Sequence, residues 1–200
     1  MVQWIGDLAD PDPHVRKVSG LRLYLAAAIL CSAAINRWLE DAEFRALVRD
    51  FAPDEKGAAK ARYVVGIAVE PAHFEKIRAA NGSPRLSQVP PDQDALEFEL
   101  HLGGTHQFDI LTAREPGGAG AIAGYLKKFG EGIQQIELNV TDVDRATKLL
   151  RERFGLKPIY PATRPGADDT RVNFFLVSTP SGGKFLAELV EAPAKRRTAG

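Results

Sequence analysis

The pattern of apolar and polar residues divides the chain into a helical first part and a β-rich second part. Residues 15–37 are rich in alanine and leucine and contain no proline, which favours a helix. Residues 1–13, with two prolines, are expected to form an irregular lead-in. A second amphipathic helix is predicted by apolar residues that recur at i, i+3, i+4 and i+7: Phe44, Leu47, Val48 and Phe51. We therefore predict a helical N-terminal extension over residues 1–57.

Beyond Gly57 the pattern becomes typical of strands alternating with short helices. Residues 64–69 form a β-rich run, and residues 71–80 follow as a short helix. Residues 96–102 alternate strictly between apolar and polar, which indicates a half-buried strand. After a turn at Gly103-Gly104, residues 107–112 are expected to return as the next strand.

The same order of elements then recurs. Residues 133–140 are predicted to be a strand, residues 142–154 a helix, and residues 171–177 and 184–191 two more strands. The linker between the copies, residues 116–120, leads into a short helix around residues 122–129. Such a repeat indicates one unit over residues 58–193 that is built from two modules, 58–115 and 130–193. Residues 194–200 are expected to be a disordered tail.

Composition and charge narrow the classes of protein. Lys+Arg and Asp+Glu are equal at 26 each, so we expect neither a nucleic-acid partner nor an acidic membrane surface. The single cysteine, Cys31, has apolar neighbours and is expected to be a buried thiol. The start lacks the layout of a signal peptide. The apolar stretch 21–35 contains Arg22 and is shorter than the ~20 residues that span a bilayer, so a cytoplasmic location is expected.

Several short runs resemble those of a known family. They include Gly103-Gly104-Thr105, and an ending in which Ser181-Gly182-Gly183 precedes residues 186–191. Between these lie residues 108–111, 122–126 and 130–133. Together they resemble methylmalonyl-CoA epimerase, a member of the vicinal oxygen chelate (glyoxalase/bleomycin-resistance) superfamily. The resemblance implies an α+β fold in which two βαβββ modules, with two curved and mostly antiparallel sheets, form a glyoxalase-like cleft behind the helical extension.

The resemblance also implies where a divalent metal would be bound. In that family the first strand of each module supplies one ligand and the last strand another. The internal repeat places the first pair at Val64 and Gln135, five residues before Val69 and Val140. The second pair falls at Asp109 and Glu188.

Two of these positions depart from the family. The epimerases have histidine at both first-strand positions, whereas valine cannot coordinate a metal and glutamine offers only a carbonyl oxygen suited to hard cations. The metal candidates are therefore Asp109, Gln135 and Glu188, a degenerate set. The glutamate that serves the epimerases as a base is expected near Gln88, which has no proton chemistry.

The candidate residues also have structural interpretations. Glu188 lies in an otherwise apolar strand, where an unpaired carboxylate would be costly, and this favours a functional role. Asp109 sits either in the cleft or on a polar strand face. One of Gln134 and Gln135 must face inward, as a ligand or as a structural hydrogen-bonding group.

Two histidines are further candidates for an acid–base group or a displaced metal ligand. His101 shares a strand face with two glutamates, and His106 lies at the turn before Asp109. A solvated strand face and an exposed turn are the alternatives. The ligand-binding candidates are Asp109, Gln135, Glu188, Gln88 and His101.

Three hypotheses of function follow, in order of preference. The first is a binding module that holds a small polar or acyl-CoA-like molecule without a metal cofactor. The second is a divergent epimerase, isomerase or lyase that uses a divalent metal to stabilise an enolate. The third is an assembly role in which the N-terminal helices mediate a homodimer.

Overall fold

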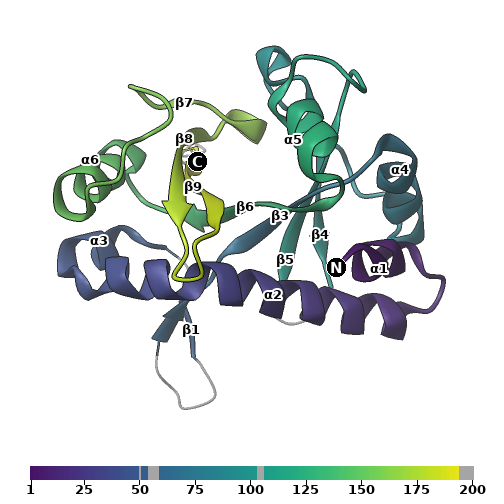
Figure 1. Ribbon diagram of the computed structural model, residues 1–200, viewed down its shortest axis with the longest axis horizontal. Helices are drawn as coiled ribbons and strands as arrows, with labels where there is room; N and C mark the ends of the chain where they lie inside the picture. The colour runs from purple at the N-terminus through teal and green to yellow at the C-terminus, as the bar shows by residue number, and fades with distance from the viewer. Residues whose placement is uncertain (50, 54–58, 103–105, 194–200) are drawn as a thin grey trace, which may run out of the picture.

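The computed structural model describes residues 1–49, 51–53, 59–102 and 106–193 (Figure 1). The turn expected at Gly103-Gly104, the last residues of the predicted N-terminal extension (54–57) and the expected tail 194–200 lie outside this range.

A seven-stranded mixed sheet forms the body of the protein, in the order β4-β5-β3-β6-β9-β8-β7. The expectation of two separate sheets is wrong, because β3 and β6 pair with each other and join the modules. All five residues of β3 are buried, so both edges of this strand need hydrogen-bond partners from neighbouring strands. The strands are β3 (Val64–Ala68), β4 (Ala95–His101), β5 (Gln107–Ala113), β6 (Gly132–Asn139), β7 (Arg164–Pro165), β8 (Arg171–Ser178) and β9 (Lys184–Glu191).

The register of the sheet defines an approximate twofold axis. β3 and β6 run antiparallel with Val65 opposite Ile136, so an axis through this pair exchanges the two strands. Each strand also pairs in parallel with the last strand of its own module, β3 with β5 and β6 with β9. The axis therefore relates three pairs of positions: Val64 and Gln135, Gly66 and Glu137, and Asp109 and Glu188.

The two modules differ in one strand. The second consists of β6, α6 (Val143–Phe154), β7, β8 and β9, which is the expected βαβββ order. The first consists of β3, α4 (Pro71–Ala80), β4 and β5, and its described residues contain no counterpart of β7. The loop between α4 and β4 contains Pro84 and Pro90, which have no N–H to donate to a ladder. Between the modules lies α5 (Ala121–Phe129).

The N-terminal lead-in is helical rather than irregular. It forms α1 (Val2–Gly6) and a short 3-10 helix, Asp7–Ala9, in which Ile5 and Leu8 are fully buried. The Asn81 side chain, at the end of α4, donates a hydrogen bond of 2.9 Å to the Leu8 carbonyl oxygen. Burial of these two apolar side chains stabilises a segment whose prolines alone predicted a loop.

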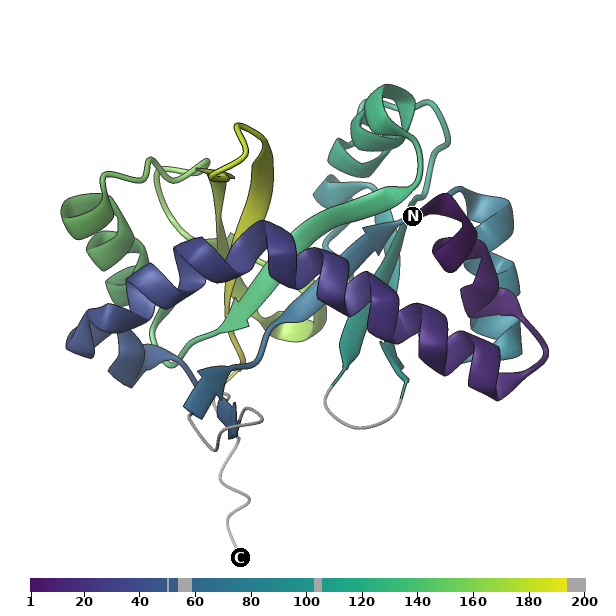
Figure 2. The ribbon, with the colours of Figure 1, turned by 60° about the horizontal axis from the view of Figure 1, so that its bottom comes forward.

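The longest helix, α2 (Pro13–Glu40), runs across the strands of both modules, in front of them in the view of Figure 2. Its buried face carries residues at helical spacing: Leu23, Ala27, Cys31, Ile35 and Trp38. The opposite face exposes Leu25 and Ile29, the latter by 81%. With 28 residues, α2 confirms the helix predicted over residues 15–37 and extends two residues before it and three residues beyond it. It is long and apolar enough to cross a membrane on length and composition alone, a test that core helices of soluble proteins also pass.

The second predicted helix is shorter than expected. α3 (Ala42–Leu47) ends before Val48, which forms an isolated β-bridge with Val140. Phe51 belongs to β1 (Phe51–Pro53), which pairs with β2 (Ala59–Ala61). The apolar stripe thus continues from a helix into extended backbone, because Val48 gains a pairing partner at the edge of β6.

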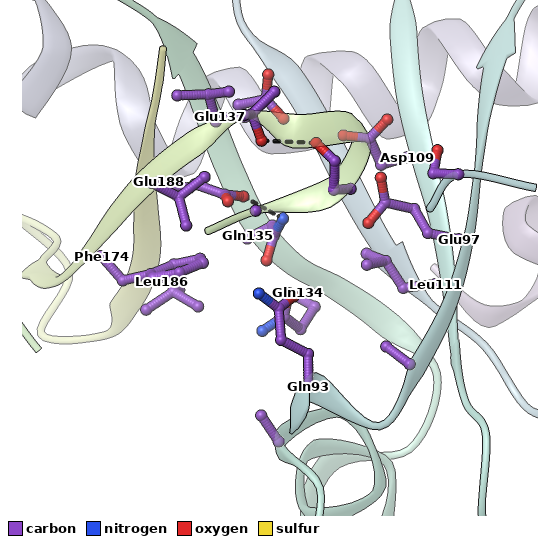
Figure 3. A pocket seen from close by; sticks show the side chains of 18 of the residues that line it. Gln93, Glu97, Asp109, Leu111, Gln134, Gln135, Glu137, Phe174, Leu186 and Glu188 are labelled. Carbon is purple, nitrogen blue, oxygen red and sulfur yellow. Dashed lines mark hydrogen bonds between the residues drawn. The ribbon is translucent and has the colours of Figure 1, made fainter. Parts of the chain in front are cut away.

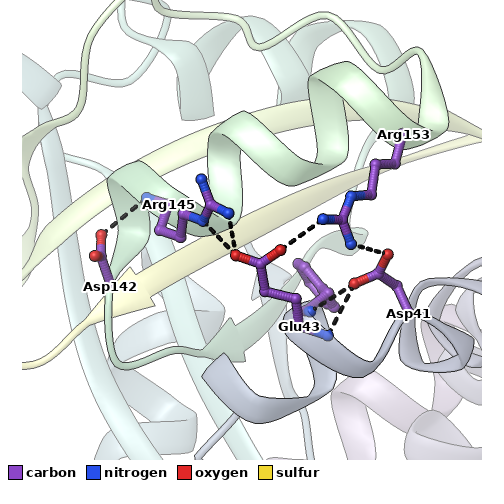
Figure 4. A network of polar contacts seen from close by, with 6 residues as sticks. Asp41, Glu43, Asp142, Arg145 and Arg153 are labelled. Carbon is purple, nitrogen blue, oxygen red and sulfur yellow. Dashed lines mark hydrogen bonds and ion pairs between the residues drawn. The ribbon is translucent and has the colours of Figure 1, made fainter.

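Ion pairs fasten the extension to the second module (Figure 4). Arg145 of α6 donates to Glu43 of α3, and Arg153 donates to both Glu43 and Asp41. Asp41 also caps α3 by accepting from the backbone N–H of Phe44 at 2.9 Å. The extension therefore packs on its own chain.

Candidate functional site

A cavity of about 630 Å³ lies between the two modules (Figure 3). Alternate residues of a strand face the same side of a sheet, and each long strand contributes one such row to the wall. The rows are Ala95, Glu97 and Glu99 of β4, Gln107, Asp109 and Leu111 of β5, and Leu186, Glu188 and Val190 of β9. The last strands of the two modules thus face each other across the cavity.

Four strands each contribute one carboxyl group with a raised pKa to the cavity wall: Glu97, Asp109, Glu137 and Glu188. Burial is the main cause that raises the pKa of each of them, and repulsion by the other carboxylates adds to it. The pKa of Glu97 and that of Glu137 rise to about 8. The cluster therefore holds protons at neutral pH.

Hydrogen bonds organise these groups into two pairs. The Asp109 carboxyl donates to the Glu137 carboxylate. On the other side, Gln135 Nε2 donates to Glu188 Oε2 at 2.5 Å. Gly66 makes room for the glutamine, because a Cβ at this position would lie 2.4 Å from Gln135 Cγ.

A bulge brings two adjacent glutamines to the cavity. The register of β3 against β6 shifts between Gly66 and Ile67, so Gly66 faces Gln135 whereas Ile67 faces Ile133. Gln134 is the extra residue that has no partner across the strands, and a bulge interrupts the alternation of side chains. Both Gln134 and Gln135 line the cavity, so the bulge brings in one glutamine more than strict alternation would.

The residues present do not fit the transition-metal site that the family resemblance implies. Val64 has no donor atom, and the amide nitrogen of Gln135 points at Glu188 rather than leaving the side chain free. Across residues 1–49, 51–53, 59–102 and 106–193, no group of three or more His, Cys, Asp or Glu side chains is arranged to hold a metal ion. Oxygen atoms alone also match zinc and cobalt poorly.

The five residues predicted to bind a ligand divide into two sets. Asp109, Gln135 and Glu188 lie together in the cavity. Gln88 is exposed, and its backbone pairs with Asp168 instead. The His101 side chain is 61% exposed and lies 3.5 Å from Glu99, outside the cavity wall.

The structure places neither Gln88 nor His101 in the wall of this cavity, and their role in ligand binding stays a prediction. Gln88 belongs to an outer loop whose course the spacing of residues does not determine, and His101 lies beyond the part of β4 that reaches the cavity. The other histidine considered, His106, packs edge-on against the Tyr24 ring with centroids 4.7 Å apart.

Among the cavity carboxyls with a raised pKa, two were missed by the sequence reasoning, Glu97 and Glu137. The alternation through Glu97 showed that β4 has one polar face, but a polar face looks the same in sequence whether it meets water or a cavity. The available signal for Glu137 was strand alternation, because Glu137 lies two residues after the candidate Gln135 in β6 and therefore faces the same side of the sheet.

Loops from both modules meet at the mouth of the cavity. Arg85 pairs with Asp168 at 2.9 Å, and Gln93 Nε2 donates to the Pro165 carbonyl oxygen at 2.9 Å. Arg164 pairs with Asp92 across the same boundary. The modules are thus joined at the sheet and again at the mouth.

Paired modules, last-strand carboxyls and a cavity between them define the class: this is a vicinal oxygen chelate fold. The structure is similar to methylmalonyl-CoA epimerase from Mycobacterium tuberculosis, with a TM-score of 0.55, 29% identity, and coverage of 75% of this chain and 92% of that one. It is also similar to a methylmalonyl-CoA epimerase in complex with methylmalonyl-CoA and NH4+, with a TM-score of 0.52, 26% identity, and coverage of 67% and 96%.

The fold is shared with the hypothetical protein BH1468 from Bacillus halodurans C-125, at a TM-score of 0.55 and 23% identity over 68% of this chain and 96% of that one. No family model and no curated protein matches the sequence.

Proposed function

We propose that this protein binds a small polar or acyl-CoA-like ligand in the cavity between its modules, without a tightly held transition metal. The observation that carries the proposal is a contrast between the first-strand and the last-strand positions at which the resemblance places metal ligands. The last-strand positions keep the carboxyls Asp109 and Glu188, whereas the first-strand positions hold Val64 and an amide, Gln135, that serves Glu188.

The size and lining of the cavity support a small-molecule ligand. A volume of about 630 Å³ is within the range of about 300–1,000 Å³ usual for such sites. The carboxyl cluster forms the polar side, and Leu111, Phe174 and Leu186 contribute apolar surface. A relative crystallised with methylmalonyl-CoA supports an acyl-CoA as one ligand to test.

A second candidate function is favoured by the raised pKa of Glu97, about 8. A general base works best when its pKa is near the working pH. In a proton transfer next to a carbonyl, the Glu97 carboxylate would take the proton from carbon as the C–H bond breaks. A protonated carboxyl such as Glu188, whose pKa is also raised and which only accepts a hydrogen bond from Gln135, would donate a hydrogen bond to the enolate oxygen, which is the chemistry of an epimerase, isomerase or lyase.

Calorimetric titration of the full chain with acetyl-CoA, propionyl-CoA and methylmalonyl-CoA tests the first candidate. Glu188→Gln is expected to weaken binding by about tenfold, the effect of losing one hydrogen bond of about 1.5 kcal/mol. Glu75→Gln, at an exposed position of α4, is the matched control and should leave binding unchanged. Equal affinity in the protein and in Glu188→Gln would place the ligand elsewhere.

The second candidate has its own measurement. Exchange of the α-proton of methylmalonyl-CoA with D₂O, followed by NMR, reports proton abstraction directly. We expect exchange to depend on Glu97 and to be lost in Glu97→Gln, while Glu75→Gln exchanges as the unmodified protein does. Binding without exchange would leave the protein as a binding module only.

A further inference from the structure

The cavity wall carries many more acidic than basic side chains. Among the described residues that line it, Arg164 is the only lysine or arginine, and it is already paired with Asp92 and placed over the Tyr160 ring. Asp168 is likewise paired, with Arg85. No ion pair found among the described residues includes Glu97, Asp109, Glu137 or Glu188.

The cavity wall also offers hydrogen-bond acceptors for which no free donor is at hand. Gln134 Oε1 is buried and has no hydrogen-bond donor within the described part of the chain. The donors near it are already used: Gln93 Nε2 donates to Pro165, and Gln135 Nε2 donates to Glu188. A buried acceptor without a donor destabilises the folded state, and a ligand that brings an N–H or O–H would remove this cost.

We propose that the ligand of this cavity carries a protonated amino group, held by the carboxyl groups of Glu97 and Glu188 while its hydrocarbon part packs on Leu111, Phe174 and Leu186. The inference rests on the proposed function, since it names the chemical class of ligand for the same cavity. An ammonium group supplies positive charge and three donors and needs no acceptor. It therefore matches a wall that is rich in acceptors and poor in cations.

The same inventory argues against two other kinds of ligand. A carboxylate ligand would find no free cation, because Arg164, the only lysine or arginine among the described residues of the wall, is already paired, and it would repel any carboxyl of the wall that ionises. A metal ion requires several ligand atoms around one point, and the described residues contain no group of three or more His, Cys, Asp or Glu side chains arranged in this way. Ammonium hydrogen bonds, of about 2.7–2.9 Å, tolerate carboxyls that are spread along a wall.

Three probes of similar shape and different charge test the inference: 2-phenylethylamine, 2-phenylethanol and 3-phenylpropanoate. Each is titrated into the full chain at pH 7 and followed by calorimetry and by NMR shifts. We expect the amine to bind at least about tenfold more tightly than the alcohol, as expected for a charge-assisted hydrogen bond, and the carboxylate to bind most weakly. Glu97→Gln and Glu188→Gln should each weaken the amine about tenfold, whereas Glu75→Gln should not.

Several outcomes would overturn the inference. One is an alcohol or a carboxylate that binds as tightly as the amine, and another is amine binding that is unchanged in both glutamine variants. Stoichiometric Mg²⁺ or Mn²⁺ that displaces the amine would show that the cluster is a metal site. If the CoA thioesters bind through Glu188 and the amine does not, the inference fails while the proposed function stands; if no probe binds, both fail.

Discussion

Replacing Glu97 by glutamine should change how the stability of the protein depends on pH. The pKa of Glu97 rises from 4.5 to about 8 on folding, because burial and the neighbouring Asp109 disfavour its charged form. Between these two pH values the folded chain holds a proton that the unfolded chain has lost. The free energy of unfolding therefore falls as the pH rises through this window, and the loss is complete above about 8.

The size of the effect can be bounded. A pKa that moves from 4.5 to about 8 corresponds to at most about 5 kcal/mol, at about 1.36 kcal/mol for each pH unit. Glu97 keeps some contact with solvent and titrates together with Asp109, so one residue carries only part of this value. We expect Glu97→Gln to be about 2 kcal/mol more stable than the unmodified protein at pH 9, and similar in stability at pH 5.

Urea unfolding followed by circular dichroism between pH 5 and 9, at constant ionic strength, measures this difference. The quantity of interest is the stability of the variant minus that of the unmodified protein at each pH, which removes the contribution of other titrating groups. Glu75→Gln, an exposed change of the same chemistry, should give a flat difference. A flat difference for Glu97→Gln, or one that falls with rising pH, would refute the raised pKa.

Three further predictions concern the fold. Gly66→Ala should destabilise the protein by about 1–3 kcal/mol in urea unfolding, because the new Cβ overlaps the buried Gln135 side chain. Gly124→Ala in α5 is the control: its Cβ meets nothing within 4 Å, so it should be neutral or stabilising. Equal effects of the two changes would contradict this geometry. Arg153→Ala should lower the urea midpoint at low salt and lower it less in 1 M NaCl, because salt screens exposed ion pairs. Arg151→Ala, whose partner Glu152 is its neighbour in the same helix, should have a smaller effect, and a loss that does not depend on salt would show another cause. Deleting residues 1–57 should expose the sheet and cause aggregation by light scattering, and a soluble, equally stable truncation would show that the extension covers nothing essential.

The repeat was the most predictable part of the fold. Strand periodicity and the order of elements are local properties of the sequence. They identified Val64 and Gln135, and likewise Asp109 and Glu188, as equivalent positions in the two modules. The register of the sheet relates the same pairs through its twofold axis. The joining of the modules into one sheet was not predictable, since β3 and β6 are far apart in sequence and their pairing depends on tertiary packing.

The cavity was only partly predictable, because its walls depend on how the sheet curls. Glu97 lies on a strand that alternates as an exposed edge strand does, and only the opposing strands of the second module turn its polar face into a cavity wall. Gln88 was placed by counting along a Pro-rich loop, where the spacing of residues does not determine position. Gln134 reached the cavity through a bulge, which no periodic pattern indicates.

The central claim is that the cavity works through its carboxyl groups without a tight transition metal, and metal analysis tests it most directly. Protein purified without chelator is measured by mass spectrometry of its metal content, beside the double variant Val64→His/Gln135→His. We expect no stoichiometric Zn²⁺, Co²⁺ or Ni²⁺ in the unmodified protein and a gain of metal affinity in the double variant, because imidazole restores the missing donors. One transition metal per chain in the unmodified protein, lost on Glu188→Ala, would contradict the claim.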